Sequence, residues 1–171
     1  MADEPKPNPP PRYMIDKYEL LRNAYYGTGG FETGDYLVQH KRELPENYEN
    51  RKMIAYFLNY VAPVVNSHVD PVFRKEAQRD WKGSGANLWE AFFSDADCSG
   101  YSLPRFMKRA AQEAKLFGVT FVVLDNVQEP PATVAEALAT RAFPYLYTVT
   151  PDRVTDWKVD RKGRLTSITY T

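Results

Sequence analysis

The stretch SLPRFMKRAAQEAKLFGVTFVVLD, residues 102–125, has the pattern of a helix, a stop and a strand. Its first part places apolar side chains on one helical face and charged side chains on the other. The apolar set is Leu103, Phe106, Ala110, Ala114 and Phe117. The pattern predicts an amphipathic helix of about four turns, with its apolar stripe against a core.

Both ends of this helix carry boundary signals. Ser102 is predicted as the N-cap because its hydroxyl can accept an amide of the first turn, and Pro104 is tolerated there. Gly118 is predicted to end the helix, since glycine enters the left-handed conformation without steric cost. Residues 119–124 are β-branched and apolar without polar alternation, which predicts a strand covered on both faces.

Length and charge limit the class of protein. The 171 residues fit one domain, and 22 basic residues balance 22 acidic ones. A net charge of zero excludes a global field that would draw the chain to nucleic acid or to an anionic membrane. The single cysteine, Cys98, excludes an internal disulfide and a cysteine-rich zinc site. No apolar run suggests a membrane span, so we expect a soluble protein made in the cytoplasm.

The chain divides into an arm and a domain. Residues 1–12 hold five of the thirteen prolines and predict a disordered proline-rich arm, either an ordinary terminus or a partner-binding segment. Residues 13–171 are predicted to form one domain. The chain ends within a predicted strand, from which we expect it to be the N-terminal part of a longer protein.

The remaining patterns predict an α+β fold. Helices are expected over residues 13–26, 46–68, 87–94 and 133–141. Pro63 should kink the second of these or divide it into two helices. Three short strands, residues 145–149, 154–159 and 165–170, predict a C-terminal antiparallel meander with Gly163 at its last turn. The expected architecture is therefore N-terminal helices, a central helix with a buried strand, and a three-stranded meander.

The segment Asp95–Gly100, DADCSG, resembles the opening of a calcium-binding EF-hand loop. The twelfth position of that loop should be a bidentate glutamate, and here it is Phe106. The pattern therefore favours a polar turn before the central helix. We predict no metal and no cofactor.

A second acidic set supports an alternative function. Asp125, Asp152, Asp156 and Lys158 resemble the residues of a metal-dependent DNA phosphodiesterase. Such carboxylates normally come from different strands, so that they converge on the metal. The short spacing from Asp152 to Asp156 instead favours a turn followed by a strand.

Basic residues on the back of the central helix are weak candidates for nucleic-acid contact. They are Arg105, Lys108 and Arg109. A solvated helix face is the favoured interpretation of the three, with phosphate contact as the alternative.

The order of several short patterns resembles the N-terminal, or wing, part of the portal proteins of tailed bacteriophages. The matching pieces, in order, are Tyr36-Leu37, Tyr48-x-x-Arg51, Asn59, Val72-Phe73-Arg74-Lys75, Gly100-x-Ser102-x-x-x-Phe106, Gly118 to Asp125, Arg141 to Tyr145, and Pro151 to Trp157 with Gly163 beyond. They are collinear with the family's pieces over residues 13–171. The long stem helix, the clip and the crown of the family would lie after Thr171.

The resemblance implies a structural role without catalysis. Portal proteins form homo-oligomeric rings, usually dodecamers, at one capsid vertex, and are head-to-tail connectors. Double-stranded DNA passes through the ring channel during packaging and ejection, driven in by a terminase. Adaptor and tail proteins dock on the ring, and the major capsid protein surrounds it. We expect a virion protein made in the host cytoplasm, with no membrane partner.

A ring subunit must bury surface against its neighbours. The aromatic residues Trp89, Phe92, Phe93 and Trp157 are the candidates for this interface, and core packing is the alternative for each. A third hypothesis is a small adaptor domain that binds one protein through the proline-rich arm.

Overall fold

The computed structural model describes residues 12–79, 85–127 and 131–171. The helices are α1 (Arg12–Tyr26), α2 (Gly30–Thr33), α3 (Pro45–Ile54), α4 (Val61–Val69), α5 (Ala86–Ser94), α6 (Leu103–Phe117) and α7 (Val134–Thr140), with the 3₁₀ turn η1 (Pro151–Arg153). The strands are β1 (Phe121–Asp125), β2 (Tyr145–Val149), β3 (Val154–Val159) and β4 (Leu165–Tyr170). The α+β class is confirmed. Of the proline-rich arm, residues 1–11 lie outside the described residues, and Arg12 begins α1.

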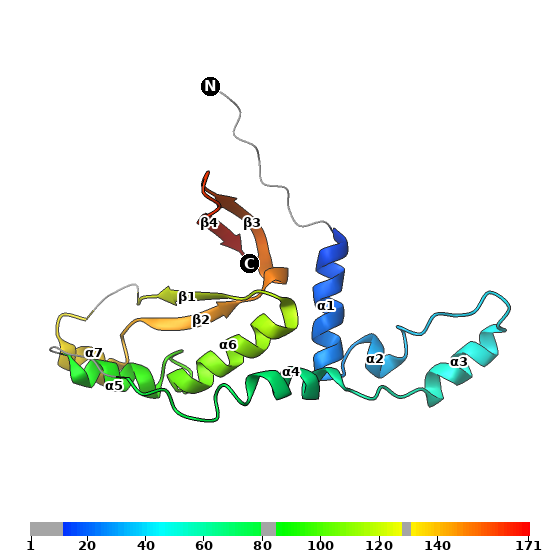
Figure 1. Ribbon diagram of the computed structural model, residues 1–171, viewed down its shortest axis with the longest axis horizontal. Coiled ribbons are helices and arrows are strands. Elements are labelled where there is room, and N and C mark those ends of the chain that lie inside the picture. The colour runs from blue at the N-terminus through cyan, green and yellow to red at the C-terminus, as the bar shows by residue number, and fades with distance from the viewer. Residues whose placement is uncertain (1–11, 80–84, 128–130) are drawn as a thin grey trace, which may run out of the picture.

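Helix α6 is the central element of the body (Figure 1). Its predicted apolar stripe is confirmed, because Phe106, Ala110 and Phe117 are buried. Gly118 has φ of 88° and donates its amide to the Ala114 carbonyl, as a left-handed C-cap should. Ser102 occupies the predicted N-cap position, but its side chain makes no capping hydrogen bond.

The strand after α6 is covered on one face only. Strand β1 pairs with β2 in an antiparallel two-stranded sheet, with Phe121 opposite Val149 and Asp125 opposite Tyr145. Helix α6 runs along one side of this sheet (Figure 1). On the other side Val122 and Leu124 are exposed, Leu124 by 64%. The prediction of a strand buried on both faces is therefore wrong, because no second layer covers this sheet within the described residues.

The three C-terminal strands do not form one sheet. Strands β3 and β4 form an antiparallel hairpin, and Gly163 takes a positive φ of 76° at its turn, as predicted. Strand β2 pairs with β1 instead, because η1 redirects the chain between β2 and β3. The predicted three-stranded meander is thus correct for its last hairpin only.

The two sheets meet through a pair of tyrosines. The hydroxyl groups of Tyr147 on β2 and Tyr170 on β4 share a hydrogen bond. This bond stabilises the protonated phenol and raises the pKa of Tyr147 to about 12. The hairpin is therefore joined to the body by side chains.

The predicted second helix is divided into two helices, but the break lies at residues 55–60 and not at Pro63. These residues have no regular secondary structure between α3 and α4; Ala55 is extended and Tyr60 has helical backbone angles. Asn59 ends this segment, and its side-chain oxygen accepts the amides of Val61 and Ala62. Pro63 lies in the first turn of α4, where a missing amide costs no intrahelical hydrogen bond.

Residues 28–60 project from the body at one end of the long axis (Figure 1). We call them the arm; they are a different segment from the proline-rich arm of residues 1–12. The arm is held together by polar contacts. The Tyr48 hydroxyl donates to the Leu37 carbonyl at 2.9 Å, and the Arg51 guanidinium donates to the Val38 carbonyl at 3.0 Å. Arg51 also pairs with Glu43. These bonds fix the loop after α2 against α3.

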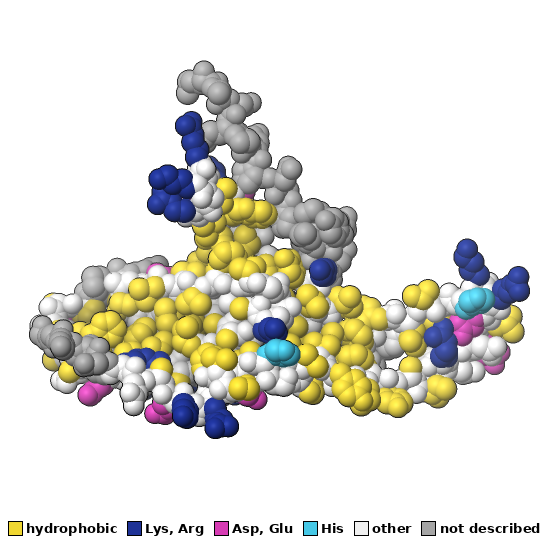
Figure 2. Space-filling model, in the orientation of Figure 1, with side chains coloured by type: hydrophobic (Ala, Val, Ile, Leu, Met, Phe, Trp, Pro, Cys, Tyr) yellow, Lys and Arg dark blue, Asp and Glu magenta, His cyan; other side chains and the backbone are white. Residues whose placement is uncertain are grey.

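The apolar core is small. Within the described ranges, eleven apolar residues are buried, and four of them are alanines. Twenty large apolar side chains are exposed in the same ranges. Single exposed apolar residues are normal, but this excess leaves contiguous apolar surface for a partner to cover (Figure 2).

Candidate functional site

The calcium-like loop is satisfied by the protein itself. Asp95 is only 6% exposed; one carboxylate oxygen accepts the Gly100 amide at 2.8 Å and the other accepts the Arg141 guanidinium at 3.0 Å. Arg141 has φ of 53°, a conformation that costs a non-glycine residue about 1–2 kcal/mol. The ion pair with Asp95 offsets this strain. The Arg141 guanidinium thus pairs with the Asp95 carboxylate oxygen that a bound calcium ion would need.

Hydrogen bonds within the chain also hold the rest of this loop. One Asp97 carboxylate oxygen accepts the amides of Ser99 and Tyr101, each at 3.0 Å. The Ala96 carbonyl accepts the Leu146 amide at 2.7 Å, which ties the loop to β2. The segment is therefore a polar turn that joins α5, α6, α7 and β2.

The residues of the alternative phosphodiesterase site are not brought together. Asp125 lies at one end of the β1–β2 ladder, and Asp152 follows the other end, four strand steps or about 13 Å away along the ladder. Asp156 and Lys158 lie on β3, in the separate hairpin. Across the described ranges, no three His, Cys, Asp or Glu side chains gather as a metal site would require.

The three basic candidates on α6 all have partners within the chain. Lys108 pairs with Asp70 at 2.9 Å, and Arg109 pairs with Glu113 at 3.2 Å. The guanidinium of Arg105 lies over the Tyr101 ring, 4.3 Å from its centre. Nucleic-acid contact by these residues stays a prediction, and it would have to compete with these pairs.

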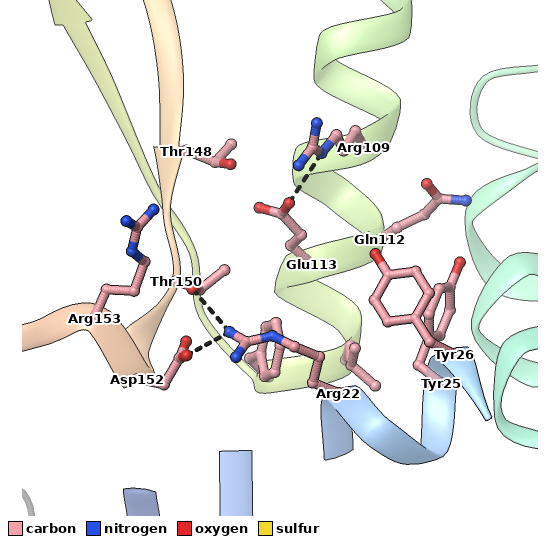
Figure 3. A pocket seen from close by; sticks show the side chains of 12 residues that line it. Arg22, Tyr25, Tyr26, Arg109, Gln112, Glu113, Thr148, Thr150, Asp152 and Arg153 are labelled. Atoms are coloured by element: carbon pink, nitrogen blue, oxygen red, sulfur yellow. Dashed lines mark hydrogen bonds and ion pairs between the residues drawn. The ribbon is translucent and has the colours of Figure 1, made fainter. Parts of the chain in front are cut away.

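A cleft of about 380 Å³ lies where α1, α6, β2 and η1 meet (Figure 3). Its charged lining residues are Arg22, Arg109, Glu113, Asp152 and Arg153. Figure 3 shows Arg22 bonded across the cleft to Thr150 and Asp152, Arg109 paired with Glu113 along α6, and Arg153 extending along the other side. No local sequence pattern indicates this cleft, because Arg22 and Asp152 are 130 residues apart.

The Arg22–Asp152 ion pair is the main bond across the cleft. The Arg22 guanidinium pairs with Asp152 and also lies over the Phe117 ring, 5.6 Å from its centre. Burial acts to raise the pKa of the Asp152 carboxyl, but hydrogen bonds from Thr150 and Arg22 outweigh it and lower that pKa below 3.8. The Arg22–Asp152 pair is therefore a joint that fixes α1 to η1, the turn before the β3–β4 hairpin.

This joint predicts a pH dependence of stability. Because the pKa of Asp152 is lower in the folded chain than in the unfolded one, its contribution is complete above pH 3.8. It is lost as pH falls through the folded-state pKa. Urea denaturation from pH 6 to pH 2 should show a smaller loss of stability for Asp152→Asn than for the natural chain. An equal loss in both proteins would contradict this assignment.

Two apolar surfaces lie outside the cleft. One is the edge of the arm, which we call the arm edge: Met53, Ile54, Tyr56, Leu58 and Tyr60. The other is the aromatic face of α5, formed by Trp89, Phe92 and Phe93. Trp89 stacks on Phe93 with ring centres 5.9 Å apart and is 47% exposed. Trp157 does not join this face, since it is half-buried on β3 opposite Ile168.

No family model and no curated protein matches this chain. The portal resemblance therefore stays a prediction. Several of its residues have clear structural roles, because Tyr48 and Arg51 hold the arm together and Asn59 caps α4. In the described part of the chain, no helix combines the length and the apolar character that a membrane crossing requires.

Sequence reasoning missed the arm edge. The segment AYFLNY, residues 55–60, was predicted as part of a helix because Phe57, Leu58 and Val61 fit a helical face. No sequence signal separates the two conformations here, because Tyr56, Phe57, Leu58 and Tyr60 make the segment apolar at nearly every position.

Proposed function

We propose that this chain is a structural subunit of a bacteriophage portal ring. In this role copies of the chain surround a channel for DNA at the capsid vertex. The terminase, the adaptor and tail proteins and the major capsid protein are its proposed partners. No catalytic step is assigned to the subunit.

The observation that supports this proposal most directly is the presence of two separate apolar surfaces. The arm edge lies at the base of the arm, between α3 and α4, and the aromatic face of α5 lies at the end of the body away from the arm (Figure 1). A closed heterologous ring requires two different patches on each subunit, one for each neighbour. The small core agrees with a chain that completes its apolar burial on assembly.

The charge distribution agrees with a wing position away from the DNA. The net charge is zero, and Arg105, Lys108 and Arg109 on α6 are each paired or stacked. A surface that grips duplex DNA needs unpaired lysines and arginines, since these release the counterions of the phosphates. In the proposed ring, this segment therefore supplies subunit contacts more than DNA contacts.

Native mass spectrometry of the purified protein tests the proposal. We expect a closed species of about twelve copies. A parallel sample with duplex DNA and magnesium or manganese should leave the DNA intact. A strictly monomeric protein at micromolar concentration would contradict the ring, and metal-dependent cleavage would revive the phosphodiesterase alternative.

A further inference from the structure

The segment of residues 55–60, between α3 and α4, has one anchored face and one bare face. On the anchored face, Phe57 contacts Phe31 with ring centres 4.2 Å apart. The Asn59 side chain donates to the Tyr25 carbonyl at 2.7 Å. The segment is therefore fixed to α1 and α2, and the direction of its bare face is defined by the fold.

The bare face is apolar and strongly exposed. Tyr56 is 85% exposed, Leu58 is 57% exposed and Tyr60 is 66% exposed. Met53 and Ile54 at the end of α3 extend the same surface. Phe57 and Asn59, between Tyr56 and Tyr60, are half-buried, so exposed and anchored side chains alternate along residues 56–60.

The size of this surface is that of an interface. At about 150–200 Å² for each fully exposed side chain, the five residues of the arm edge expose roughly 600 Å². This is at the upper end of the largest patch on a typical monomer, about 300–600 Å². It also approaches the roughly 800 Å² that each partner contributes to a standard protein interface.

The aromatic face of α5, at the end of the body away from the arm, is apolar like the arm edge. Its three aromatic side chains are of the type enriched at the centre of interfaces. The charges around this face are mixed: Glu90 is exposed beside Trp89, and the Arg79 guanidinium lies over the Phe93 ring, 5.3 Å from its centre. The tip of the arm is basic, since Lys41 and Arg42 are exposed and pair with no acidic group among the described residues, so it can approach Glu90.

We propose that the arm edge packs on the aromatic face of α5 of a second copy of this chain. This inference rests on the proposed ring and names its contact. Tyr56, Leu58 and Tyr60 of one copy cover Trp89 of the next, and the basic arm tip lies toward the side of α5 that carries Glu90. Because the arm edge and α5 are separate surfaces of one chain, each copy binds one neighbour with its arm and another with α5 (Figure 1).

Site-specific cross-linking of the assembled protein tests this contact. Ala55→Cys places a thiol beside the arm edge, and Ala86→Cys places one on α5 a turn before Trp89, both at exposed alanines. Each change is made in a Cys98→Ser background. A mixture of the two proteins, treated with a short bismaleimide, should give the mixed covalent dimer, whereas each protein alone should not cross-link to itself.

A matched control uses Lys162→Cys, an exposed position in the turn of the β3–β4 hairpin. It should not cross-link to Ala55→Cys. If the mixture assembles but the mixed dimer is absent, the contact is wrong while the ring stands. If the natural chain does not assemble at all, the proposed function itself fails.

Side-chain replacement gives a second, independent readout. Tyr56→Ser combined with Leu58→Ser, and separately Trp89→Ser, should each weaken association roughly thirtyfold or more, the effect typical of interface hot spots. The control is Val159→Ser, an exposed apolar residue on β3. Circular dichroism should show an unchanged fold in all three proteins. Association as strong as that of the natural chain in both interface variants would overturn the contact.

Discussion

Replacing Phe117 with alanine is expected to lower the free energy of unfolding by about 3–5 kcal/mol, the usual range for a buried phenylalanine. Phe117 is buried at the end of α6, and its ring meets the Tyr18 ring edge-on with centres 6.0 Å apart. The ring also supports the guanidinium of Arg22. The substitution therefore opens a cavity and loosens the joint between α1, α6 and η1 at once.

Urea denaturation at a fixed protein concentration measures this effect, because association adds to apparent stability. Met107→Ala is the matched control, since Met107 lies on the exposed side of the same helix. It should cost less than about 1 kcal/mol. Equal losses for the two substitutions would show that the Phe117 joint is unimportant for stability.

Replacing Asp95 with alanine is expected to lower the free energy of unfolding by about 3 kcal/mol, because a buried carboxylate with charged hydrogen bonds is removed. The change leaves the Gly100 amide without its acceptor and leaves Arg141 in a strained conformation without its partner. Asp95→Asn should cost less, since the amide oxygen can still accept one of these bonds. The thermal midpoint should fall by several degrees.

Asp70→Ala is the control for this prediction, because the Asp70–Lys108 pair is exposed and should contribute less than about 1 kcal/mol. Calcium addition should leave the midpoint of the natural chain unchanged, since the Asp95 oxygens are already occupied. A calcium-dependent rise would instead support the EF-hand interpretation of residues 95–100.

The sequence predicted those elements whose signals are local. The stripe of α6, its end at Gly118 and the turn at Gly163 depend on neighbouring residues, and all three are confirmed. The helix expected over residues 133–141 is confirmed as α7, and the Thr133 hydroxyl at its start accepts the Glu136 amide. Such features follow from backbone geometry and need no tertiary contact.

Strand pairing and the cleft could not be predicted in the same way. An apolar run such as residues 119–124 does not reveal whether one layer or two will cover it. The partners of Asp95 and Asp152, Arg141 and Arg22, are distant in sequence, and no local pattern pairs them. The arm edge was missed because a short apolar segment fits both a helical and an extended period.

The hairpin of β3 and β4 has an unusual attachment. No backbone hydrogen bond runs between the described residues of this hairpin and those of β1 or β2. Its orientation depends on the Tyr147–Tyr170 bond and on the Arg22–Asp152 pair beside η1. A tilt of the hairpin thus rearranges a few side chains and leaves both ladders intact, so in the proposed ring identical copies could meet their neighbours at slightly different angles without refolding.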